Sequence, residues 1–153
     1  MKYTLVILAV LGIVVSSLAL REHYREYGDS PCSINEHWDC GVVNHSPFAE
    51  LGGISEQMGF SRHIPLLGTI PVATVGILGY MVMAAAAFRR WFRLLLVLLL
   101  GSLAFSLYLA HIEKDVLGVW CIYCVMSLGI ISLMSLLTLG TVIAQSIRRP
   151  TTA

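Results

Sequence analysis

The hydrophobic residues of this chain gather in four long apolar runs, which are separated by polar segments. The runs cover about residues 3–20, 64–88, 94–112 and 119–147. A helix needs about 20 residues to cross a hydrocarbon core of about 30 Å, so each run is long enough, the first only just. Lipid admits only helices and closed barrels, and barrel strands are much shorter than these runs. The pattern predicts an all-α integral membrane protein with a bundle of four transmembrane helices.

The polar segment of about residues 21–63 is predicted to be a long loop that contains short helical segments. Ser46 is a candidate N-cap followed by Pro47, so a short helix is expected to run to about Met58. We expect residues 1–153 to form one membrane domain. The first run has an alternative reading as a cleaved signal peptide, with Ser17–Ala19 as a small-residue cleavage site. We favour a retained helix.

Composition supports the membrane assignment. Hydrophobic residues make up 57% of the 153 residues and charged residues only 12%, whereas about a quarter of a soluble domain is charged. The net charge is +1, so no nucleic-acid partner is expected. Membrane lipid is the expected surrounding.

Charge is distributed unevenly between the two sides of the predicted bundle. All nine carboxylates fall in the loop of residues 21–63 or in the short segment 113–118. The charged residues on the opposite side are all basic, namely Lys2, Arg89, Arg90, Arg93, Arg148 and Arg149. The positive-inside rule then places both termini in the cytoplasm and the long loop outside. We predict a multi-pass protein of the inner (cytoplasmic) membrane.

The four cysteines fall at the extracytoplasmic face as two pairs. Cys32 and Cys40 lie in the long loop, and Cys121 and Cys124 form a C-x-x-C motif at the start of the fourth run. Residues three apart share a helix face, and a helix N-terminus favours a thiolate. The spacing therefore favours thiol–disulfide exchange. A pair of structural disulfides and a soft-metal binding or transport protein remain alternatives.

Several neighbours of the C-x-x-C motif have two readings. Trp120 and Tyr123 fit an interfacial aromatic belt, and they could equally form the wall around a flat apolar cofactor. His111 and Glu113 are expected to be interfacial anchors, with proton donors as the alternative. Oxidation of a dithiol releases two electrons, and the sequence has no dinucleotide fingerprint to receive them. By elimination, the expected acceptor is a lipid-soluble quinone of the ubiquinone, menaquinone or vitamin K type, and no metal site is predicted.

The chain resembles the vitamin K epoxide reductase family, specifically its short prokaryotic homologues, over about residues 5–139. The matching features are Cys32 and Cys40, Asn44–Phe48, Ile70–Ala73 with Gly76, Gly79 and Tyr80, and the Cys121–Cys124 motif. The resemblance implies that Cys124 faces the quinone, that Cys40 forms a bridge to Cys121, and that Cys32 meets the external partner. Ser46 matches a serine that shapes the site. The predicted quinone-binding residues are Ser46, Pro71, Trp120, Tyr123 and Leu128.

Two departures from the family pattern refine the expected activity. Leu128 stands where the vertebrate enzymes have a tyrosine, and Gly68 or Thr69 stands where they have an asparagine. Both of those groups bind vitamin K, so their replacement favours simple quinone reduction over epoxide reduction. The chain ends at Ala153 without a fused thioredoxin-like domain, so we expect a separate thioredoxin-fold partner at the extracytoplasmic face. The predicted function is oxidation of that partner in support of disulfide bond formation.

Overall fold

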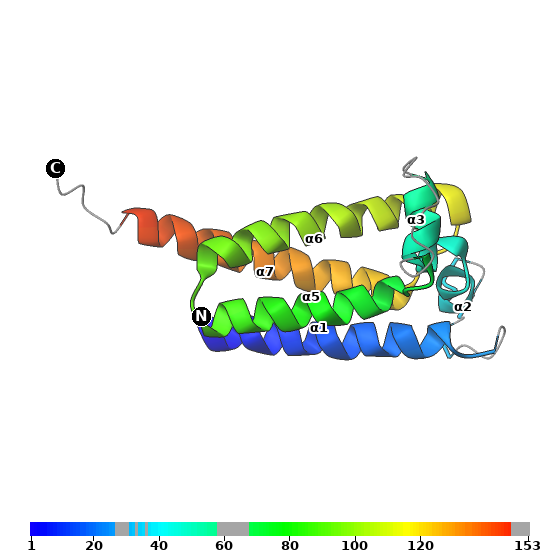
Figure 1. Ribbon diagram of the computed structural model, residues 1–153, viewed down its shortest axis with the longest axis horizontal. Helices are drawn as coiled ribbons and strands as arrows, with labels where there is room; N and C mark the ends of the chain where they lie inside the picture. The colour runs from blue at the N-terminus through cyan, green and yellow to red at the C-terminus, as the bar shows by residue number, and fades with distance from the viewer. Residues whose placement is uncertain (27–30, 33, 36, 58–67, 148–153) are drawn as a thin grey trace.

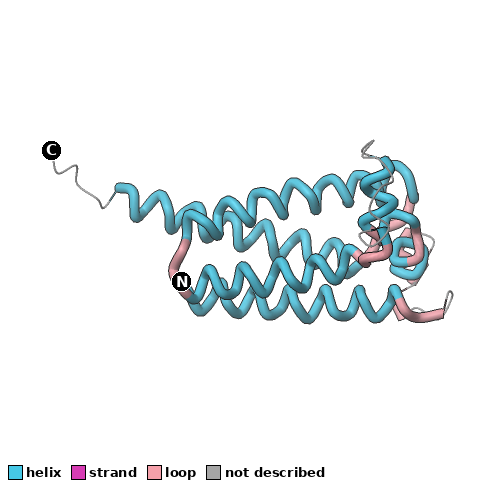
Figure 2. The backbone as a smooth tube through the Cα atoms, viewed as in Figure 1, coloured by secondary structure: helices cyan, strands magenta, loops and turns pink. Residues whose placement is uncertain are grey.

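The computed structural model describes residues 1–26, 31–32, 34–35, 37–57 and 68–147, and the statements below concern these residues. Four long helices lie roughly parallel to a common axis (Figure 1). They are α1 (Lys2–His23), α5 (Val72–Phe88), α6 (Phe92–Ile112) and α7 (Ile122–Ile147). The described residues form helices and no named strand (Figure 2), in agreement with the predicted all-α class.

Three segments are long and apolar enough to cross a membrane, namely Lys2–His23, Phe92–Leu117 and Ile122–Ile147. Helix α5 is also apolar, but it has only 17 residues and is therefore about 26 Å long. The chain is a membrane protein with these helices as its framework.

Two of the long helices begin later than the apolar runs that predicted them. The second run was expected to be helical from residue 64, but residues 64–67 lie outside the described residues and α5 begins only at Val72. Pro71 has an extended backbone and precedes the helix, and a proline disfavours helical geometry in the residue before it. The fourth run was expected to begin at Val119, but α7 begins at Ile122. The backbone of Trp120 is instead engaged with the loop.

The described residues of the loop form three short elements at one end of the bundle, which we call the loop end (Figure 1). They are α2 (Cys40–Asn44), the 3-10 turn η1 (Pro47–Ala49) and α3 (Leu51–Gln57). The helix predicted from Ser46 to about Met58 is therefore broken at Glu50, which forms a bridge with Pro71. Met58 lies outside the described residues.

The core lies between the four long helices. Helix α1 packs along α5, and α6 packs along α7. Gly12 of α1 allows the ring of Tyr80 to approach closely, since a Cβ atom there would lie 2.3 Å from that ring. The Tyr80 hydroxyl in turn contacts the Ser127 hydroxyl at 2.8 Å, so Tyr80 joins α1, α5 and α7. The fully buried members of this core include Leu5, Ala9, Ala87, Leu95, Leu99 and Met134.

Candidate active site

The four cysteines come together at the loop end of the bundle. Cys32 and Cys40 form a disulfide with their Cα atoms 5.5 Å apart, whereas Cys121 and Cys124 are free thiols. Cys32, Cys40 and Cys121 are buried in one apolar cluster, and Cys124 packs against it. The fold thus brings a disulfide and a dithiol, far apart in sequence, into one buried site.

A short pair of backbone hydrogen bonds holds Cys40 beside Cys121. The Asp39 amide donates to the Trp120 carbonyl at 3.1 Å, and the Trp120 amide donates to the His37 carbonyl at 2.8 Å. The Trp38 and Trp120 rings also pack against each other, with centroids 6.5 Å apart. Because Asp39 and Trp120 each directly precede a cysteine, this pairing fixes the register of the two redox pairs.

The Cys121 thiol has surroundings that favour its thiolate. It lies directly before α7, and the thiol of Cys124 donates a hydrogen bond that lowers the pKa of Cys121, opposed in part by burial. The Asn44 amide donates to the Cys121 sulfur at 3.8 Å and to the Cys40 carbonyl at 2.9 Å. A thiol with a lowered pKa is the better leaving group in disulfide exchange, so Cys121 is suited to exchange with Cys40.

Alkylation of Cys121 should therefore become fast at a lower pH than alkylation of an ordinary thiol. Because the pKa of Cys121 is lowered in the fold, its thiolate persists to a lower pH than that of an ordinary thiol and is lost as the pH falls through the lowered pKa. We expect half-maximal labelling below about pH 8.5, the value of a free cysteine. Peptide mass spectrometry would report labelling at Cys121 separately from Cys124. Equal profiles for the folded and the detergent-denatured protein would contradict this expectation.

Replacing Asn44 with aspartate should slow disulfide exchange at Cys121. The substitution keeps the shape of the side chain but removes its N–H donors and adds a negative charge near the sulfur. Loss of a hydrogen bond to a charged group costs about 1.5 kcal/mol, or about tenfold in rate. The rate of reduction of the oxidised Cys121–Cys124 pair by a small dithiol would measure the effect. Ser55→Ala is the control, since the Ser55 hydroxyl donates to the Gly52 carbonyl within its own helix, and an unchanged rate in Asn44→Asp would contradict the assignment.

Glu113 enters the site from the turn between α6 and α7. Helix α6 continues into η2 (Glu113–Leu117), and Gly118 then reverses the chain with φ of 69°, a conformation that suits glycine. The Glu113 carboxylate accepts the Cys121 N–H at 3.1 Å and is hydrogen-bonded to the Cys124 thiol. Its exposed fraction is only 3%. By contrast, His111 is exposed and pairs with Asp115.

The expectation that His111 and Glu113 are both interfacial anchors is therefore wrong for Glu113. The two residues are two positions apart, so they point to different sides of the helix. Sequence spacing gave no signal for the contact of Glu113 with the cysteines, because the contact is made across the turn at Gly118. The sequence likewise indicated Asn44 only as a member of the Asn44–Phe48 motif, without predicting its contact with Cys121.

A cavity of about 330 Å³ opens between the helices next to Cys124. Its volume is at the lower end of the range of about 300–1,000 Å³ for small-molecule pockets. Most of its wall is apolar, with polar groups from Asn44, Ser46, Glu113, Tyr123 and Ser127 among others. Of the residues predicted to bind a quinone, Ser46, Pro71 and Tyr123 line the cavity. Trp120 and Leu128 are not part of its described lining; Trp120 packs on Trp38 instead.

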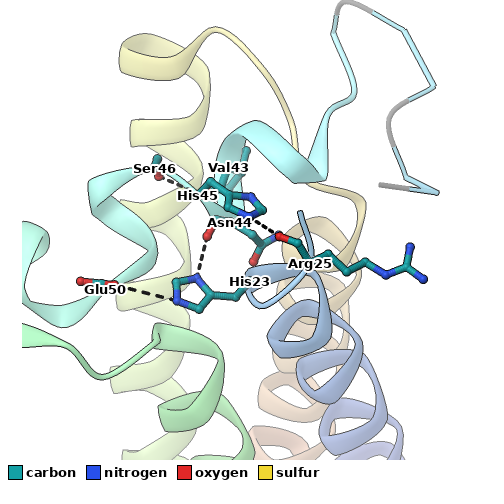
Figure 3. Close-up of polar contacts among 7 residues, drawn as sticks. All are labelled: His23, Arg25, Val43, Asn44, His45, Ser46 and Glu50. Carbon is teal, nitrogen blue, oxygen red and sulfur yellow. Dashed lines mark hydrogen bonds and ion pairs between the residues drawn. The ribbon is translucent and has the colours of Figure 1, made fainter. Parts of the chain in front are cut away.

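A set of polar contacts ties the end of α1 to the loop elements that cover the site (Figure 3). His23 donates to the Asn44 carbonyl at 2.6 Å, and its other ring nitrogen lies 3.9 Å from the Glu50 carboxylate. The His45 ring lies 2.8 Å from the Arg25 carbonyl. These contacts hold Asn44 where its side chain reaches Cys121.

A comparison with known protein families finds a match that covers most of the chain. The model of the vitamin K epoxide reductase family matches residues 3–139, which include all four cysteines and every described residue of the cavity wall. A search of curated proteins finds no match. Among the described residues, no group of three or more histidine, cysteine or acidic side chains is arranged to hold a metal ion.

Proposed function

Because the chain belongs to the vitamin K epoxide reductase family of membrane thiol–disulfide oxidoreductases, we propose that it oxidises a thioredoxin-like protein and reduces a membrane quinone. The observation that carries this proposal is the contact of two cysteine pairs beside one cavity. The Cys32–Cys40 disulfide lies against Cys121 in a buried cluster, and Cys124 lines the cavity. Electrons that enter at the loop pair thus have a short route to the cavity.

The proposed relay passes two electrons from the partner dithiol through the two cysteine pairs in turn. A partner dithiol reduces Cys32–Cys40 and becomes a disulfide. The Cys40 thiolate then attacks the oxidised Cys121–Cys124 pair at Cys121, and Cys124 leaves. Cys32 attacks the Cys40–Cys121 bridge and releases Cys121, whose lowered pKa makes it a good leaving group. The loop disulfide is restored, and two electrons and two protons now reside on Cys121 and Cys124, which is the redox state of the described structure.

The cavity is the proposed binding site of the electron acceptor. A bound quinone would accept the two electrons and two protons of the Cys121–Cys124 dithiol. The apolar wall suits a lipid-soluble ring, and Cys124 borders the cavity. Ser46, Pro71 and Tyr123 are the proposed quinone contacts, while Trp120 would act by holding Cys121 in place. Leu128 stands where the vertebrate enzymes have a tyrosine, which supports quinone reduction without epoxide chemistry.

The proposed topology follows from charge. Helix α5 would cross the membrane together with the three longer segments. The basic ends of the helices would lie in the cytoplasm, so that the loop end faces outward from the inner membrane. At that end Cys32 would meet the separate partner. Ile34 beside it is 68% exposed and offers an apolar contact for a thioredoxin-fold surface.

Purified protein, a reduced thioredoxin-fold protein and a soluble menaquinone or ubiquinone analogue would test the proposal. We expect quinone absorbance to fall in step with the appearance of the partner disulfide, one quinone for each disulfide. Stoichiometric binding of soft metal ions by the purified protein, without quinone-dependent turnover with either analogue, would overturn the proposal in favour of metal binding.

A further inference from the structure

Glu113 is a buried acid that the relay of cysteines does not use. None of the ion pairs found among the described residues involves it. Burial of a carboxylate without an ion pair is costly, and such groups are concentrated at functional sites. Its position therefore needs an explanation beyond the packing of the turn.

The contacts of Glu113 place it among the reacting atoms. One carboxylate oxygen accepts the backbone N–H of Cys121 at 3.1 Å, and the carboxyl group is hydrogen-bonded to the Cys124 thiol. Glu113 also lines the cavity that Cys124 borders. The other titratable groups facing this space are His23 from α1, Tyr80 from α5 and Tyr123 from α7. Of these groups, Glu113 is the acid that contacts Cys124 directly.

We propose that Glu113 is a catalytic residue that carries a proton from the Cys124 thiol to a quinone oxygen; this inference rests on the proposed function. The Cys124 S–H bond breaks and its proton moves to the Glu113 carboxylate. As the Cys121–Cys124 bond forms, two electrons pass to the quinone, and Glu113 gives its proton to one quinone oxygen. Cys121 releases its own proton to water, and the second quinone oxygen takes a proton from water. The dithiol is oxidised, the quinone is reduced, and Glu113 regains its charge.

Glu113 could instead serve only to cap α7 through the Cys121 N–H. A glutamine at this position would still accept that N–H through its amide oxygen, but it cannot take up and return a proton. The variant Glu113→Gln therefore separates the two roles. Asp115→Asn is the matched control, because it neutralises an exposed carboxylate on the same turn.

The kinetic test follows turnover and partner exchange in the full protein. In Glu113→Gln we expect quinone reduction to fall by about 10²-fold or more, the usual contribution of a positioned acid or base. Reduction of Cys32–Cys40 by the partner should remain at the wild-type rate, and Asp115→Asn should match the wild type in both steps. Wild-type turnover retained in Glu113→Gln would overturn this inference alone. No turnover in the wild type would overturn the proposed function as well.

A second measurement needs no variant and no quinone. Infrared difference spectra of the wild type, recorded as a soluble oxidant converts the Cys121–Cys124 dithiol to its disulfide, should show a carboxyl group that changes its protonation or hydrogen bonding. Glu113→Gln should lack that signal, and Asp115→Asn should keep it. A spectrum without any carboxyl signal in the wild type would overturn the inference, even if Glu113→Gln failed to fold.

Discussion

Replacement of Cys124 with alanine should abolish quinone reduction, with a loss of at least about 10³-fold, as is usual when a catalytic nucleophile is removed. Without Cys124, Cys121 has no partner with which to form a disulfide at the cavity, so two electrons cannot leave the protein together. Absorbance of a quinone analogue in the presence of reduced partner would measure the loss. Ser132→Ala is a suitable control on the same helix, because the Ser132 hydroxyl donates to the Leu128 carbonyl of that helix.

A double variant that also lacks Cys32 should trap an intermediate. In Cys32→Ala/Cys124→Ala a mild oxidant can join Cys40 and Cys121, which lie in one buried cluster, and neither Cys32 nor Cys124 remains to open that bridge. Peptide mapping under non-reducing conditions should therefore find Cys40 joined to Cys121. Full turnover in Cys124→Ala, or no such bridge in the double variant, would contradict the proposed order of the relay.

Replacement of Cys40 with alanine should separate the two halves of the relay. Partner-driven quinone reduction should fall by at least about 10²-fold, because the variant loses the intramolecular thiol whose proximity to Cys121 replaces a bimolecular encounter. Dithiothreitol should still reduce the Cys121–Cys124 pair, since Cys124 and the cavity wall are unchanged. The rate of quinone reduction with the partner and the rate with dithiothreitol would be measured with the same quinone analogue and compared.

Cys32→Ala provides the second arm of that experiment. It should lose the partner-driven reaction as Cys40→Ala does, because both variants lack the loop disulfide. Its Cys40 thiol still lies beside Cys121, so Cys32→Ala, unlike Cys40→Ala, should form a Cys40–Cys121 bridge. Wild-type turnover with the partner in either variant would show that electrons bypass the loop pair.

The sequence by itself predicted the class of protein and its reactive atoms. Apolar runs of this length would be costly to expose to water, and the backbone hydrogen bonds of a chain in lipid leave few alternatives to helices. The order of the runs predicted that the four cysteines share one side, and the distribution of basic residues predicted which side it is. Local signals also located helix starts approximately, although Pro71 moved the start of α5 and the backbone pairing of Trp120 moved the start of α7.

Only the tertiary structure decided how the reactive groups meet. The pairing of Asp39 with Trp120 sets Cys40 against Cys121, and this register depends on two residues that are 81 positions apart in the sequence. The turn at Gly118 folds Glu113 back onto Cys121 and Cys124, whereas a local reading of the same segment suggested an anchor at the interface. Sequence periodicity reports which residues avoid water, but the contact of an acid, an amide and four sulfurs across separate elements is set by long-range packing.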